Sequence, residues 1–247
     1  MSPKTKIPIH IATTPSNTPQ IRVVFMGTPE LASIFLKSLV ESKYNIVGVV
    51  TQPDRPVGRS QTLEGSPVKK VAIEHTLPLL QPDRLDADTI EQLKKWKPDL
   101  IVVVAYGRIL PEAILTLPGF GCINVHMSLL PRWRGASPIQ NALLSGDIES
   151  GVTIMLLDKG MDTGPILAQK SCPIDPIDRT DTLTEKLTSE KSKVFPRQTK
   201  ESLCVSSSNA KMDAFFGIFP LLKSITAIEG FIPGLASSLS GNEVKMT

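Results

Sequence analysis

Short apolar runs alternate with amphipathic segments along the first three quarters of the chain. Residues 21–26, 46–50 and 99–105 are nearly all apolar, which is typical of strands covered on both faces of a sheet. Apolar residues at helical spacing predict helices between these runs. Further strands are expected at 77–80, 123–126, 152–157 and 166–172, and helices after Pro29, from Ser66, over 86–96 and over 137–146.

This alternation predicts an α/β fold: a Rossmann-like, open, mostly parallel sheet with helices on both faces. We expect a disordered N-terminal tail over 1–20 and a single folded domain over 21–190. Beyond residue 190 the apolar residues lose both the period of a strand and that of a helix. Residues 191–247 are therefore expected to form an atypical, poorly ordered tail.

The ends of three predicted strands carry Gly27-Thr28, residues 105–107, and Asn124 with His126. Ligands of open parallel sheets bind at the carboxyl ends of the strands, so we expect these segments to meet in one crevice. Thr28 is expected to cap the first helix. The first turn lacks the G-x-G-x-x-G pattern, and Pro29 removes a backbone donor, which disfavours a nicotinamide or flavin cofactor.

Asn124 and His126 sit two residues apart, so on a strand their side chains point to the same face. An amide beside an imidazole can recognise a carbonyl oxygen as it gains negative charge. The pair therefore indicates acyl-group chemistry. A hydrogen-bonded pair with a purely structural role at a strand end is the alternative.

A second polar cluster, from Asp158 to Gly164, places two carboxylates around glycines. As a site, it would supply one carboxylate, from Asp158 or Asp162, as the partner of His126. A carboxylate close to an imidazole favours its protonated form and fixes its orientation. The alternative is a surface turn, because Asp and Gly are common turn residues.

Residues 51–65 form a long polar loop rich in Pro and Gly after the second strand. Its Arg55 and Arg59 are candidates for binding phosphate, and a solvated loop without function is the alternative. The first 190 residues hold 20 basic and 20 acidic side chains, so any contact with nucleic acid must be local.

Three cysteines, Cys122, Cys172 and Cys204, are present without a C-x-x-C pattern, which predicts neither a disulfide framework nor a metal site. No apolar run is long enough to cross a bilayer, so no membrane association is expected. The first acidic residue is Glu30, and the leader is rich in Ser, Thr, Pro and Lys. A mitochondrial or plastid transit peptide is one interpretation, but the leader has no Arg before Arg22, which favours a cytoplasmic protein.

Residues 21–190 resemble the catalytic domain of the methionyl-tRNA formyltransferases, a family of folate-dependent enzymes. The Asn-x-His and Ser-Leu-Leu-Pro elements at 124–131 are typical of folate-dependent formyltransferases in general. The Gln-Pro-Asp-Arg-Pro loop at 52–56 and the Arg-Trp-Arg-Gly-Ala run at 132–136 are typical of the enzymes acting on tRNA. The segments that match are 24–29, 51–56 with 58–59, 66–69, 103–107, 124–140, 151–155 and 161–164.

The resemblance implies transfer of a formyl group from 10-formyltetrahydrofolate to the amine of initiator methionyl-tRNA. It implies that Asn124, His126 and Asp162 are catalytic. It also implies that the loop carrying Arg59 enters the acceptor end of the tRNA. The side chains implied to line the folate site are Ser128, Leu129, Leu130 and Pro131. No metal is required, and we expect a monomer.

Two segments depart from the family pattern. Ser60, Gln61 and Thr62 stand where the family often has lysines, which predicts a weaker hold on phosphate. Residues 191–247 do not resemble the C-terminal β-barrel of the family, so that domain is expected to be missing, or disrupted by a disturbed reading frame. Two other functions stay open: a folate-dependent formyltransferase or hydrolase acting on a small amine or nucleotide, and a degenerate protein that binds folate or tRNA without catalysis.

Overall fold

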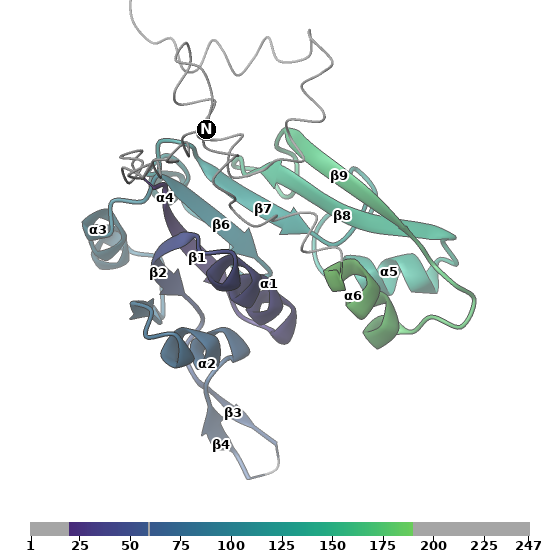
Figure 1. Ribbon diagram of the computed structural model, residues 1–247, viewed down its shortest axis with the longest axis horizontal. Helices are drawn as coiled ribbons and strands as arrows, with labels where there is room; N and C mark the ends of the chain where they lie inside the picture. The colour runs from purple at the N-terminus through teal and green to yellow at the C-terminus, as the bar shows by residue number, and fades with distance from the viewer. Residues whose placement is uncertain (1–19, 59, 190–247) are drawn as a thin grey trace, which may run out of the picture.

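The computed structural model describes residues 20–58 and 60–189, which form an α/β fold around one large sheet (Figure 1). The seven strands lie in the order β5-β2-β1-β6-β7-β8-β9. Five of them pair in parallel, and the last two run antiparallel at one edge. The strands of this sheet are β1 (Arg22–Gly27), β2 (Asn45–Val50), β5 (Leu79–Leu80), β6 (Leu100–Val104), β7 (Cys122–His126), β8 (Glu149–Leu156) and β9 (Ile166–Pro173).

Helices cover both faces of the sheet, and the strands supply apolar side chains to each. Successive residues of a strand point to opposite faces, so Val23 and Phe25 of β1 join one core while Val24 and Met26 join the other. The first core packs against α1 (Glu30–Glu41), α2 (Pro67–Glu74), α5 (Pro138–Leu144) and α6 (Thr180–Ser189); the second packs against α3 (Ala87–Lys95) and α4 (Glu112–Leu115). The predicted Rossmann-like, mostly parallel sheet is thereby confirmed.

The chain winds outward from β1 in two directions, first through β2 to β5 and then through β6 to β9. The order of the strands therefore reverses between β1 and β6. The carboxyl ends of the strands on either side of such a reversal leave room for a ligand, because the connections that follow them lead away in opposite directions.

The structure contains a hairpin and two helices that the sequence did not predict. The loop predicted over 51–65 contains a short antiparallel hairpin, β3 (Arg55–Val57) and β4 (Thr62–Glu64), which projects from the body of the molecule (Figure 1). Its strands are three residues long and include Pro56, so they lack the alternating pattern that identifies a strand. Helices α4 and α6 were not predicted, because α4 spans only one turn and α6 is largely polar.

The prediction that Thr28 caps α1 is wrong. Pro29 is the N-cap residue, and the helix begins without a capping hydrogen bond from the side chain of that residue. The Thr28 hydroxyl instead donates to the Tyr106 carbonyl at 3.1 Å, which ties the end of β1 to the end of β6. The tails predicted over 1–20 and 191–247, with the missing or disrupted barrel, lie outside the described residues except for Gln20.

Candidate active site

A cavity of about 710 Å³ lies at the carboxyl ends of β6 and β7. Tyr106 and Gly107, just after β6, share its lining with Asn124 and His126 of β7 and with Pro29 after β1. The prediction that strand ends meet in one crevice is thus confirmed for residues 105–107 and for Asn124 with His126, whereas Pro29 lines the cavity in place of the predicted Gly27 and Thr28. Its size lies in the range of sites for small organic molecules. The apolar part of the lining includes Ile109, Leu110, Leu115, Leu157 and Met161.

Asn124, His126 and Asp162 come together on one wall of this cavity. The Asn124 amide nitrogen donates to Oδ1 of Asp162 at 3.2 Å, and His126 Nδ1 lies 3.6 Å from Oδ2 of the same carboxylate. The side chains of His126 and Asp162 are only 7% and 11% exposed, so little water screens the two groups from each other. Of the two carboxylates left open by the sequence, Asp162 is the one beside the imidazole.

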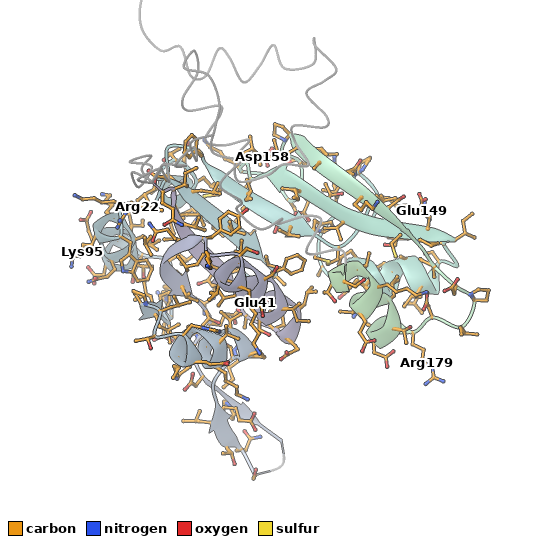
Figure 2. All side chains as sticks on the ribbon, in the orientation of Figure 1. Arg22, Glu41, Lys95, Glu149, Asp158 and Arg179 are labelled. Atoms are coloured by element: carbon orange, nitrogen blue, oxygen red, sulfur yellow. The ribbon has the colours of Figure 1, made fainter. Side chains whose placement is uncertain are left out.

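The Asp158 side chain instead forms hydrogen bonds within the turn that contains it. Its carboxylate accepts hydrogen bonds from the Gly160 backbone and the Thr163 hydroxyl at 2.8 to 2.9 Å. In Figure 2, Asp158 and Glu149 are labelled near opposite ends of β8, and the turn that joins β8 to β9 begins at the Asp158 end. Asp158 thereby shapes the segment from which Asp162 reaches back to β7.

Asp162 itself has a left-handed backbone, with φ of 51°, which is uncommon for a residue other than glycine. Besides the bond from Asn124, one more hydrogen bond and the packing of Gly164 fix this segment. The Gly135 backbone nitrogen donates to Oδ2 of Asp162 at 2.8 Å. Gly164 packs so tightly that a Cβ added to it would lie 2.0 Å from the Leu156 carbonyl oxygen. Close backbone packing at Gly164 therefore fixes how the turn folds back onto β8.

We expect Gly164→Ala to lower the free energy of unfolding by about 1–3 kcal/mol, because the added methyl group can be accommodated only by shifting backbone. The shift also moves Asp162, so kcat should fall together with stability. Gly119→Ala is the matched control, since nothing lies within 4 Å of a Cβ at that position. Urea unfolding of both proteins measures the difference, and equal stability would contradict this account of the turn.

The His126 ring is also bonded on its far side. Its Nε2 lies 2.8 Å from the Trp133 carbonyl oxygen. A carbonyl oxygen only accepts, so Nε2 is the donor and carries a proton. A neutral His126 then has its lone pair on Nδ1, facing Asp162. With the first ring proton on Nε2, Nδ1 can donate a hydrogen bond only when the ring has gained a second proton, at Nδ1. This requirement could not be predicted from the sequence.

Ser128, Leu129, Leu130 and Pro131, implied by the resemblance to line the folate site, are not among the described residues that line the large cavity. Ser128 is fully buried, and its hydroxyl donates to the Arg132 carbonyl at 2.6 Å. Thr153 of β8 bonds both the Ser128 carbonyl and the Leu130 nitrogen. In this structure the four residues shape the segment after β7, and their contact with folate stays a prediction.

Of the two arginines predicted to bind phosphate, Arg55 is the first residue of β3. Arg55 donates to the side-chain oxygen of Gln52, whose own amide nitrogen donates to the Tyr106 carbonyl at 2.8 Å. Gln52 therefore links the base of the hairpin to the cavity wall. Arg59 lies outside the described residues.

Within residues 20–58 and 60–189, no group of three His, Cys, Asp or Glu side chains is arranged to hold a metal ion. No helix in the same residues is long and apolar enough to cross a membrane. Burial raises the pKa of the Cys122 thiol to about 12, so this thiol, at the start of β7, stays protonated at neutral pH and is a poor nucleophile.

This chain is similar to known proteins both in sequence and in fold. Residues 21–199 match the family model described as formyl transferase. The methionyl-tRNA formyltransferases of Pseudomonas fluorescens Pf-5 and Legionella pneumophila Paris are 54% and 52% identical over 171 and 168 residues, which is 69% and 68% of this chain. Because those stretches are 54% of each relative, the chain spans about half their length.

The similarity in fold is found among solved structures. The phosphoribosylglycinamide formyltransferase of Bacillus halodurans superposes with a TM-score of 0.61 at 26% identity, covering 71% of this chain and 92% of that one. The glycinamide ribonucleotide transformylase 1 of Geobacillus kaustophilus also reaches 0.61, at 25% identity, over 72% of this chain and 96% of its own. The fold around the cavity is therefore shared with enzymes whose names describe another acceptor.

Proposed function

This chain belongs to the formyl transferase family, and from that premise we propose that it transfers a formyl group from 10-formyltetrahydrofolate to the α-amine of initiator methionyl-tRNA. The observation that carries the proposal is the meeting of Asn124, His126 and Asp162 at the cavity wall. Relatives at 52–54% identity that bear the name methionyl-tRNA formyltransferase support this acceptor. These relatives are bacterial, and we propose that the protein acts in the cytoplasm.

The volume of the cavity and its apolar lining support the formyl donor as its ligand. Ile109, Leu110, Leu115 and Leu157 offer apolar contact to a flat ring system. Tyr106 also lines the cavity, and its buried hydroxyl has no hydrogen-bond partner among the described residues.

Asn124 is placed to stabilise the developing charge. The neutral amine attacks the formyl carbon, the carbonyl bond opens, and negative charge gathers on the formyl oxygen. One Asn124 amide hydrogen binds Asp162, which leaves the second hydrogen for that oxygen. A preorganised donor of this kind contributes roughly 3–4 kcal/mol to the stability of the transition state.

His126 moves the proton. As the amine forms its bond to carbon it becomes positively charged, and the lone pair on Nδ1 of His126 accepts one of its protons, directly or through water. The neighbouring Asp162 carboxylate stabilises the imidazolium. The same proton then passes to the folate nitrogen as the carbon–nitrogen bond breaks, so the enzyme ends in its starting state.

A formylation assay with purified protein and 10-formyltetrahydrofolate tests the proposal. Charged initiator methionyl-tRNA is compared with glycinamide ribonucleotide and with free small amines. Transfer to the tRNA alone supports the proposal. Transfer to a small amine alone would replace it with the second candidate, which the fold shared with glycinamide ribonucleotide enzymes favours. Folate binding without any transfer would indicate a degenerate binding protein.

A further inference from the structure

Asp147 lies outside the large cavity, in the connection between α5 and β8, yet its side chain is only 11% exposed and both of its carboxylate oxygens accept hydrogen bonds. Oδ2 accepts from Arg132 Nε at 2.9 Å and from the Trp133 indole nitrogen at 2.7 Å, and Oδ1 accepts from Arg132 Nη2 at 2.5 Å. The Asp147 backbone is itself fixed, because its nitrogen donates to the Ala142 carbonyl of α5 at 3.0 Å. One carboxylate thus holds two successive side chains of the segment after β7.

That segment leads directly to the proposed catalytic groups. Trp133 has φ of 59°, a left-handed backbone that is unfavourable in a residue other than glycine and persists only when its surroundings hold it. Held in this way, the Trp133 carbonyl accepts from His126 Nε2, and two residues later the Gly135 nitrogen donates to Asp162. The Arg132 guanidinium lies 4.7 Å from the centre of the Trp133 ring and packs over it.

From these contacts we infer that Asp147 is a positioning residue: through Trp133 it keeps the His126 proton on Nε2 and leaves Nδ1 as the nitrogen that works in the cavity. The inference rests on the proposed function for its effect on rate. Its effect on the imidazole tautomer does not depend on that function. A carboxylate that served only to stabilise the fold would leave the tautomer unchanged when removed.

The clamp formed by Asp147, Arg132 and Trp133 does not titrate near neutral pH. The hydrogen bond from Arg132 lowers the pKa of the Asp147 carboxyl below its usual range. A lowered pKa in the folded state means that the stabilisation is complete above the unfolded pKa and is lost only as the pH falls through the folded one. Between pH 6 and 9 the Asp147 carboxyl therefore stays ionised, so the clamp keeps its charge over the range in which the test is made.

The test is nitrogen NMR of protein labelled with 15N at its three histidines, with the His126 signals identified by their loss in His126→Gln. In the wild-type protein above the imidazole pKa, Nε2 should carry the proton and Nδ1 should be bare. Asp147→Ala should show a mixture of both tautomers. Its kcat should fall about 10- to 100-fold while KM for the folate donor changes less than about threefold.

Two further variants complete the test. Trp133→Phe removes the indole donor but keeps the Arg132 pair, and it should shift the tautomer and kcat in the same direction to a smaller extent, even if Asp147→Ala folds poorly. Asp175→Ala is the control, because it also removes a carboxylate paired with a cation, Lys186, in a loop that does not touch the site. It should leave both readouts unchanged.

The outcomes separate the two proposals. A wild-type His126 protonated on Nδ1, or a folded Asp147→Ala protein with the wild-type tautomer, would overturn the inference. Absence of formyl transfer in the wild-type protein would overturn the proposed function alone, because the tautomer can still be measured. A fall in kcat for Asp147→Ala with an unchanged tautomer would also overturn the inference.

Discussion

Asp162→Asn protein is expected to transfer formyl groups with a kcat about 10²- to 10³-fold below that of the wild type. Both carboxylate oxygens are engaged: Oδ1 accepts from Asn124 and Oδ2 accepts from the Gly135 backbone. An amide has one oxygen, so its nitrogen must face one of these donors and the group must turn away. The substitution therefore removes the charge beside His126 and also disturbs Asn124.

Steady-state kinetics with saturating formyl donor and methionyl-tRNA measure this effect, with thermal unfolding as the check on folding. We expect a loss of stability of about 1–2 kcal/mol, since one buried donor is left without a partner. Asp158→Asn is the comparison, because that carboxylate bonds only within its own turn, and its kcat should change less than about tenfold. Equal losses in the two variants would refute a special role for Asp162.

His126→Ala should lower kcat by about 10²- to 10⁴-fold, which is the range for loss of a positioned general base. The substitution also takes away the hydrogen bond to the Trp133 carbonyl. A buried carbonyl without a partner costs about 1–3 kcal/mol, so some loss of stability accompanies the loss of rate. The rate effect must therefore be separated from the effect on the fold.

His126→Gln makes that separation. Its amide nitrogen can still donate to the Trp133 carbonyl, but the side chain cannot accept a proton at neutral pH. We expect stability close to that of the wild type together with a kcat nearly as low as that of His126→Ala. If single-turnover rates of His126→Gln stay within threefold of the wild type, His126 does not move the proton and the proposed mechanism is wrong.

The sequence predicted the sheet because its central strands carry a strong signal. Residues 99–105 are apolar on both faces, and β6 is buried along its whole length. The same signal cannot identify the hairpin over 55–64, whose side chains are mostly exposed and whose pairing is set by a turn. The spacing of apolar residues along the sequence reflects which side chains are buried, so it does not identify strands whose side chains are exposed.

For the site, the two-residue spacing of Asn124 and His126 on a strand was enough to pair them. The residue pattern alone left Asp162 as one of two candidates, and only the family resemblance singled it out, because its approach depends on the tight packing of Gly164 against Leu156. The contact between His126 and the Trp133 carbonyl could not be predicted at all. Every residue has a backbone carbonyl, so its presence near an imidazole has no signature in the sequence.

Because β8 and β9 add to the sheet in antiparallel orientation after β7, the residues of the site come together in a fixed order during synthesis. Asn124 and His126 belong to the parallel half of the sheet, whereas Asp162 emerges 36 residues later and reaches them only once β8 lies against β7. A nascent chain that ends just after β7 thus contains Asn124 and His126 but not the Asp162 carboxylate that contacts them. The proposed site is therefore complete only after the chain through Asp162 has been synthesised and β8 has paired with β7.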